Sequence, residues 1–394
     1  MPRKLAVGQS GGATAVINSS LVGVVREAMQ AGVFSEIWGM RRGVEGALAD
    51  DFVDLSSLSQ EKLEAIAYTP GAALASSRHK APDEDIERLL DILRRRDIVS
   101  FLYIGGNDSA DTVHRLAAHA GHRGQSLQAI SIPKTIDNDL RGTDHCPGYG
   151  SIARYVAIAT MDSAKDTESM PTMYPIKIIE VMGRDAGWVV AASALGKRSP
   201  LDAPHLLYPP ERRLSLDQLL RDVDCVYRRY GYVVAVTAET LRDTEGRPFA
   251  DPELRSELDK FGHPLIRGTA DMMCRIIQSE LGPRSRFDKP GSLQRMSMLC
   301  VSDTDLEEAE MVGRAAVRMA LGGETDRMVT LIRESDDSYR CSTGSSELSD
   351  VANQQRLLPS NAILDDGSDV SDEFRRYAMP LLGRRPLPVY ARLG

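Results

Sequence analysis

Short apolar runs alternate with longer amphipathic stretches along most of this chain, and this alternation restricts the folds open to it more than any other feature. A short run of β-branched and apolar residues is typical of a strand buried on both faces, and a longer amphipathic stretch is typical of a helix. Their alternation indicates βαβ units, so we expect an α/β fold with mostly parallel sheets. The expected strands are Lys4–Gly8, Glu36–Met40, Asp97–Ile104, Leu127–Ile132, Pro175–Met182 and Tyr232–Glu239.

The composition is that of a globular protein long enough for two domains. The chain has 394 residues, of which 42% are hydrophobic and 26% charged. Its net charge is −8 and it has no dense Lys/Arg block, so we expect no nucleic-acid partner. No apolar run approaches the length of about 18 residues that spans a membrane, and no charged-then-apolar leader opens the chain. The five scattered cysteines favour reduced thiols over disulfides or a zinc site, so we expect a cytoplasmic protein.

Three stretches in the second half show no clear period. Leu241–Phe261 is polar and rich in turn residues, Gly282–Arg295 looks like a surface connection, and Ser335–Gln355 looks like a loop or hairpin. No internal repeat is present, and no low-complexity block interrupts the chain.

Polar clusters follow five of the expected strands. Ligand sites in α/β folds lie beyond the carboxyl ends of the strands, so these clusters are candidates for one site. Glycine turns and helix caps would explain any single cluster, but they explain the whole set poorly. The clusters are Gly8–Val16, Ile104–Thr112, Pro133–Asp139, Val181–Trp188 and Ala238–Asp243.

The first two clusters are rich in glycine. Gly11 and Gly12 lie between a strand and a helix, where backbone N–H groups are available to an anion. The spacing is neither GxGxxG nor GxxxxGK[ST], which argues against a standard dinucleotide site and a Walker loop. In the second cluster, Asp108 and Ser109 either cap the following helix, or Asp108 holds Mg²⁺ directly or through water.

The next two clusters supply the other groups that a phosphoryl transfer needs. Asp137 and Asp139 are two residues apart, so one can take a proton from a hydroxyl while the other helps to bind metal. Thr135 can donate to a phosphoryl oxygen, and Lys134 adds a compact positive charge. Arg184 is either a surface arginine or a guanidinium that contacts the transferring group.

Taken together, these segments resemble the phosphofructokinase family and, within it, the pyrophosphate-dependent members. TIDND at Thr135–Asp139 followed by MGR at Met182–Arg184 is highly specific for the family. The resemblance covers most of the chain. Its segments are Ser10–Asn18, Arg41–Gly46, Thr69–Lys80, Gly105–Ser109, Pro133–Asp139, Pro147–Ser151, Val181–Arg184, Phe261–Pro264 and Val351–Asn353.

The resemblance implies two doubly wound α/β domains with the active site in the cleft between them. We expect a phosphoryl-donor domain of residues 1–150 plus about 266–325, and a sugar-binding domain of residues 151–265 plus about 326–394 with a C-terminal extension. The resemblance also implies a Mg²⁺ cofactor and a homodimer or homotetramer.

The resemblance assigns roles to individual residues. Asp137 looks like the base that activates the 1-hydroxyl of the sugar, with Thr135 and Asp139 beside it. Arg184 looks like the residue that stabilises the transferring phosphoryl group. The remaining family assignments are Gly11 and Arg78 for the donor, and Met182, Gly183, Glu239 and His263 for the sugar. We add Asp108 and Lys134 as donor-binding residues, Asp108 as the metal ligand, and Arg267 as a further sugar-binding residue.

Two positions indicate the phosphoryl donor. ATP-using relatives read GGDGS and PGTIDND, with glycines that leave room for the nucleotide. Here Asp108 and Lys134 fill both places. The two side chains would crowd a nucleotide, whereas the lysine charge can hold pyrophosphate.

Fructose 6-phosphate is the default acceptor. The residues that hold its phosphate in the family are replaced here by Pro175, which has no charge, and Glu257, which would repel a phosphate. Lys177 and Arg267 are candidates to replace them. The alternatives are sedoheptulose 7-phosphate, another sugar or a nucleoside as acceptor. Asn107 and Asp185 depart from the family pattern, which leaves open a catalytically silent sugar-phosphate-binding regulator.

Overall fold

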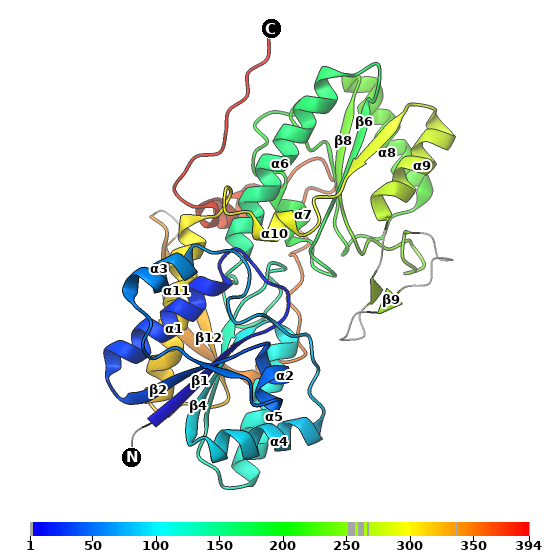
Figure 1. Cartoon of the computed structure of the whole chain (residues 1–394). Helices are drawn as coiled ribbons and strands as arrows, with labels where there is room; N and C mark the ends of the chain where they lie inside the picture. The colour runs from blue at the N-terminus through cyan, green and yellow to red at the C-terminus, as the bar shows by residue number, and fades with distance from the viewer. Residues whose placement is uncertain (1–2, 251–256, 259–263, 266–267, 336–337, 394) are drawn as a thin grey trace. The chain divides into compact units, whose positions relative to one another are not determined.

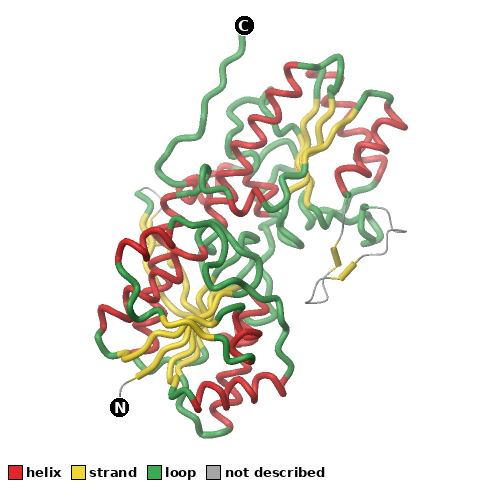
Figure 2. Tube along the Cα trace, in the orientation of Figure 1, coloured by secondary structure: helices red, strands yellow, loops and turns green. Residues whose placement is uncertain are grey.

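The chain forms two compact units, each built on its own sheet (Figures 1 and 2). The computed structural model describes residues 3–250, 257–258, 264–265, 268–335 and 338–393. The first unit comprises Met1–Ser151 and Arg295–Arg356, and the second comprises Ile152–Gln294 and Leu357–Gly394. The predicted α/β fold with mostly parallel sheets is therefore confirmed. Within the described residues, no helix combines the length and apolar character needed to cross a membrane.

The first unit contains a seven-stranded sheet whose five central strands are parallel. The two edge strands pair antiparallel with their neighbours. The strand order is β13 (Arg340–Glu347), β12 (Arg327–Ser335), β5 (Gln128–Pro133), β4 (Ile98–Gly105), β1 (Arg3–Gln9), β2 (Phe34–Met40) and β3 (Phe52–Asp54).

Helices cover both faces of this sheet, so its central strands are buried on both sides (Figure 1). Leu5 and Val7 of β1 pack into the core cluster that contains α1 and α11, whereas Ala6 between them packs into the cluster that contains α4 and α5. Successive residues of a strand thus pack into cores on opposite faces of the sheet, which explains why the sequences of these strands are continuous apolar runs. The helices are α1 (Ile17–Ala31), α2 (Gly43–Leu48), α3 (Gln60–Ala67), α4 (Asp83–Arg95), α5 (Asn107–His122) and α11 (Asp303–Leu321), with a 3₁₀ turn at Leu348–Asp350.

The second unit contains a four-stranded parallel sheet with the order β11 (Ser285–Asp288), β6 (Ile176–Val181), β8 (Val233–Ala238) and β7 (Leu206–Tyr208). A short antiparallel pair is formed by β9 (Glu257–Leu258) and β10 (Pro264–Leu265). The other helices of this unit are α7 (Trp188–Ala192), α8 (Leu216–Tyr230), α9 (Thr269–Leu281) and α12 (Asp372–Ala378), with a 3₁₀ turn at Met379–Leu382. Helices α6 (Tyr149–Ser169) and α10 (Leu293–Met296) each cross a boundary between the two units.

Two segments belong to the other unit from the one that we expected, and strand pairing is the reason. Residues 266–294 lie in the second unit because β11 pairs with β6, with Ser285 opposite Ile176. Residues 326–356 lie in the first unit because β12 pairs with β5, with Arg327 opposite Ile130. The segment that looked like a surface connection is thus partly a sheet strand.

Candidate active site

A glycine turn at the carboxyl end of β1 lies among three cationic side chains. Gly11 has a φ of +76°, a conformation that favours glycine. Lys134 Nζ donates to Gly12 O at 2.8 Å, and the lysine is only 3% exposed. A Cβ at Gly12 would lie 3.8 Å from Arg78 Nη2 and would collide with Arg295 Nη1. Three positive charges therefore lie close to the turn, and no side chain larger than that of glycine fits at Gly12 with Arg295 in this position. Such a turn suits a small polyanion.

The second glycine cluster leads into α5, which begins earlier than we expected. Gly106 is the N-cap residue, and no side chain caps the helix, so the capping alternative for Asp108 and Ser109 is wrong. Asp108 lies in the first turn instead, near the positive end of the helix dipole. Asn107 Nδ2 lies 3.5 Å from Asp139 Oδ2, and Asn107 Oδ1 is buried with no hydrogen-bond partner among the described residues. A buried amide oxygen without a donor is a candidate ligand for a cation.

The two aspartates lie on the irregular segment that follows β5. Asp137 N–H donates to Thr135 Oγ1 at 3.1 Å, and Asn138 Oδ1 accepts from Cys146 N–H at 3.0 Å. Asn138 has a φ of +55°, so the chain turns between the two aspartates and their side chains do not follow strand alternation. Asp137 is half-buried and Asp139 is 9% exposed. The turn therefore places the two carboxylates in environments that differ in burial. Two carboxylates in different environments can take different chemical roles.

A charged cluster anchors the far end of the same segment. His145, 1% exposed, contacts Asp144 through Nδ1 at 2.7 Å and Glu308 through Nε2 at 2.6 Å. Arg333 Nη2 donates to Asp144 at 3.0 Å, and Tyr339 Oη donates to Glu308. Burial alone would lower the pKa of His145, but its hydrogen bonds to the two carboxylates outweigh this and raise the pKa to about 9. The imidazole is therefore charged at neutral pH.

The charged state of His145 should make stability fall at high pH. Its folded pKa of about 9 lies above the usual 6.5, so the stabilisation is fully present below pH 6.5 and is lost as pH rises through 9. Replacement of His145 by Gln should lower the free energy of unfolding by up to about 3 kcal/mol at pH 6.5. Urea unfolding at pH 6.5, 8 and 9.5 would measure this difference. A difference between wild type and variant that stayed constant over this range would contradict the assignment.

In the second unit, a tight turn after β6 carries the arginine singled out from the sequence. Gly183 has a φ of +143° and Arg184 a φ of +48°, so two consecutive residues reverse the chain. Met182 N–H donates to Gln294 Oε1 at 3.1 Å, and Gln294 is 2% exposed. Thr240 Oγ1 donates to Arg184 O. These contacts fix the backbone from which the Arg184 guanidinium extends.

Two acidic groups near the Lys289 ammonium lie at the ends of β6 and β8. Burial raises the pKa of Glu239, and the charge of Lys289 partly opposes this increase. Glu180, 1% exposed, forms an ion pair with Lys289 and accepts from Ala270 N–H at 2.9 Å. Glu239 is therefore a weakly acidic carboxyl held close to other charges, which suits hydrogen bonding to hydroxyl groups.

The structure divides the expected site residues between the two units. In the first unit these are Gly11, Arg78, Asp108, Lys134, Thr135, Asp137 and Asp139, and in the second they are Met182, Gly183, Arg184 and Glu239. His263 and Arg267 lie outside the described residues. Sequence reasoning missed Asn107 as an uncharged ligand candidate, and it missed Arg295, Gln294, Lys289 and Glu180. The LQR triplet at Leu293–Arg295 could have drawn attention to two of them.

Lys177 does not offer a charge to a sugar phosphate. Its side chain is 6% exposed, and Nζ forms ion pairs with Asp166 at 3.3 Å and Asp288 at 3.1 Å. Pro175 lies just before β6, and its carbonyl accepts from Val233 N–H at 2.7 Å. Lys177 is therefore already paired with two carboxylates, and Arg267, the other candidate for a phosphate anchor, lies outside the described residues.

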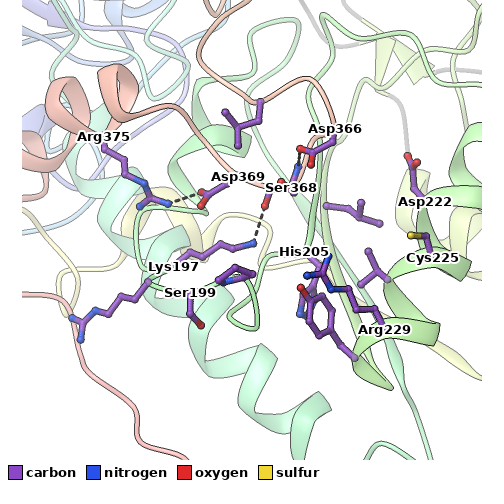
Figure 3. A pocket seen from close by; sticks show the side chains of 16 residues that line it. Lys197, Ser199, His205, Asp222, Cys225, Arg229, Asp366, Ser368, Asp369 and Arg375 are labelled. Carbon is purple, nitrogen blue, oxygen red and sulfur yellow. Dashed lines mark hydrogen bonds and ion pairs between the residues drawn. The ribbon is translucent and has the colours of Figure 1, made fainter.

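A separate cavity of about 530 Å³ lies in the second unit (Figure 3). Lys197 on its wall donates to Ser368 O at 2.8 Å, and Arg375 forms an ion pair with Asp369. His205, another lining residue, is buried, and desolvation lowers its imidazole pKa to about 4. None of the described residues singled out from the sequence lines this cavity.

Comparisons with known proteins agree with the fold. The family model described as Phosphofructokinase matches residues 4–320. The pyrophosphate–fructose 6-phosphate 1-phosphotransferase of Rhodospirillum rubrum is 40% identical over 97% of this chain and 94% of its own length. The sulfofructose kinase of Alkalicoccus urumqiensis is 31% identical over 91% of this chain and 92% of its own length.

A solved structure is similar over nearly the whole chain. The pyrophosphate-dependent phosphofructokinase from Marinobacter aquaeolei superposes with a TM-score of 0.88 and 36% sequence identity. The match covers 99% of this chain and 94% of that one. With the glycine turn, the TIDND segment and the MGR turn all in place, this chain belongs to the phosphofructokinase family and is a phosphotransferase.

Proposed function

We propose that this enzyme transfers a phosphoryl group from pyrophosphate to the 1-hydroxyl of fructose 6-phosphate, reversibly and with Mg²⁺. The observation that carries the choice of donor is the buried Lys134 ammonium bonded to Gly12 O at 2.8 Å, beside Arg78 and Arg295. An ammonium at 3% exposure and two arginine side chains make this turn favourable for a negative charge. Pyrophosphate supplies that charge without the bulk of a nucleoside.

The site residues have separate tasks in this reaction. Asp137 takes the proton from the sugar hydroxyl as the oxygen attacks the phosphoryl group, and Thr135 donates to a phosphoryl oxygen. Arg184 stabilises the charge on the transferring group, and Glu239 binds a sugar hydroxyl. We assign donor binding to the first unit and sugar binding to the second. Phosphoryl transfer needs mainly positioning and charge neutralisation, which these groups supply.

We place the proposed Mg²⁺ in the first unit. The described residues contain no group of three or more His, Cys, Asp or Glu side chains suited to a metal. Mg²⁺, however, commonly takes one or two protein ligands together with substrate phosphates. Asn107 Oδ1, buried without a donor, would hold it together with Asp108 and Asp139, directly or through water. When bound, the ion would neutralise charge on the pyrophosphate oxygens.

A second candidate keeps this chemistry and changes the acceptor. Pro175 offers no charge, Lys177 is already paired with two aspartates, and Glu257 at the start of β9 is acidic. One relative at 31% identity is named a sulfofructose kinase. An acceptor with a different distal group is therefore the alternative, such as sedoheptulose 7-phosphate, another sugar or a nucleoside. The presence of Asp137, Thr135 and Arg184 gives no support to a catalytically silent regulator.

We further propose that the enzyme is cytoplasmic and forms an oligomer. All five cysteines are free thiols, which supports a cytoplasmic location. A role in sugar breakdown such as glycolysis would follow from the acceptor. We also propose a homodimer or homotetramer, which light scattering of the purified protein would test.

A matched assay of donors and acceptors tests the function directly. With Mg²⁺ and fructose 6-phosphate, turnover with pyrophosphate should exceed turnover with ATP by at least about 100-fold, because Asp108 and Lys134 would crowd the nucleoside and a binding loss of about 2.8 kcal/mol corresponds to this factor. Phosphate release measures the reaction, and a chelator should stop it. If fructose 6-phosphate reacts only at millimolar concentration while another acceptor reacts at micromolar concentration, the second candidate replaces the first. Faster turnover with ATP would contradict the donor assignment.

A further inference from the structure

One arginine outside every segment singled out from the sequence contacts the loop that carries both aspartates. Arg356 is half-buried and is the last residue of the first unit. Its Nη2 donates to Asn138 O at 2.8 Å, and its Nε lies 3.2 Å from the same oxygen. Its Nη1 donates to Thr143 O at 2.8 Å and to Asp144 O at 2.5 Å. One planar guanidinium thus joins the two ends of the segment 138–144.

The backbone of the same residue adds a further contact. Arg356 N–H donates to Asp139 O at 2.7 Å. Asn138 lies between the two aspartates in a left-handed conformation, and such a backbone persists only when its surroundings hold it. The carbonyls of Asn138 and Asp139 are both bound by Arg356, so this arginine is a principal constraint on where the two carboxylates lie.

We infer that Arg356 is a positioning residue for phosphoryl transfer, because it fixes the loop that carries Asp137 and Asp139. This inference rests on the proposed function, and it adds a residue that lies outside the segments that carry the family resemblance. The base must lie within hydrogen-bond reach of the acceptor hydroxyl, and a displacement of about 1 Å can cost roughly 100-fold in rate. A lysine cannot replace the arginine fully, because an ammonium lacks the planar fork that reaches three carbonyls.

Steady-state kinetics of Arg356→Gln and Arg356→Lys test this role. We expect kcat of the glutamine variant to fall by roughly 10–100-fold while KM for pyrophosphate and acceptor changes less than about threefold. The lysine variant should lie between it and wild type. Arg141→Gln is the matched control, because exposed Arg141 on the same loop contacts only the Gln354 side chain at 3.0 Å among the described residues, and its kcat should stay within about twofold of wild type.

Two further measurements separate positioning from a general loss of structure. Added guanidinium ion should restore part of the activity of Arg356→Ala but should not stimulate wild type or Arg141→Gln. Amide hydrogen exchange of residues 137–148 should be faster in Arg356→Gln, with exchange in α1 unchanged.

The outcomes distinguish this inference from the proposed function. Normal kcat in a folded Arg356→Gln enzyme would overturn the positioning role, and so would a lower kcat with unchanged loop exchange. If wild type shows no turnover with pyrophosphate and any acceptor, the proposed function fails. Loop exchange alone then decides whether Arg356 holds the segment: faster exchange in the variant supports it, and unchanged exchange overturns it.

Discussion

Replacement of Asp137 by Asn is expected to lower kcat with pyrophosphate by about 10²–10⁴-fold. Asparagine keeps the size and shape of the side chain but cannot take a proton from the acceptor hydroxyl. The loop should remain in place, because Asp137 N–H still donates to Thr135 Oγ1 and Arg356 still holds the neighbouring carbonyls. KM should therefore change little, and initial rates at saturating donor and acceptor would measure the effect.

A surface aspartate supplies the control for this substitution. Asp91, whose side chain is 57% exposed, pairs with Arg123 at 3.0 Å. Asp91→Asn should keep kcat within about twofold of wild type, because exposed pairs contribute little. Turnover of Asp137→Asn close to that of Asp91→Asn would mean that another group serves as the base.

The central strands could be predicted from the sequence because they are buried on both faces. β4 and β8 are almost entirely apolar runs, and the local sequence alone identifies them. β11 has the sequence SRFD and lies at a sheet edge, where Phe287 is 44% exposed. Nothing in its local pattern distinguishes it from a loop, so the segment was misread as a surface connection.

The assignment of segments to units depends on contacts far apart in sequence. β12 joins the first unit because it pairs with β5, almost two hundred residues earlier. Alternation of apolar and polar residues along the chain predicts that a strand exists, but it carries no information on which sheet the strand joins. The boundaries of the domains were therefore wrong for residues 266–294 and 326–356, although the two-unit α/β architecture was right.

The site residues that the sequence analysis missed are those whose contacts are made between segments far apart in sequence. Lys134 and Asp137 stand out because charged groups rarely gather directly after a buried strand. Arg295 follows an unremarkable stretch and reaches Gly12 only through the fold. Asn107 lacks charge and departs from the family pattern. Only its buried Oδ1, which has no hydrogen-bond partner among the described residues, marks it as a ligand candidate.

The second large effect is expected at Lys134. Replacement by Met keeps most of the side-chain length and removes the charge, so kcat/KM for pyrophosphate should fall by about 10–100-fold. Gly12 O also loses the donor that it has at 2.8 Å. Lys62→Met, at an exposed position, is the control and should leave kcat/KM unchanged. A Lys134→Met enzyme that used pyrophosphate normally would remove the observation on which the donor assignment depends.

Charge and bulk at this position can be separated by a second variant. Lys134→Gly with Asp108→Gly removes both side chains that fill the space left open by glycines in ATP-using relatives. If bulk excludes the nucleotide, this double variant should gain measurable turnover with ATP, whereas Lys134→Met should gain none because its side chain still occupies the space. Arg78 and Arg295 remain at the glycine turn in both variants, so phosphate binding itself is retained. A double variant that still rejects ATP would therefore place the exclusion elsewhere, and Lys134 would then act only through its charge on pyrophosphate.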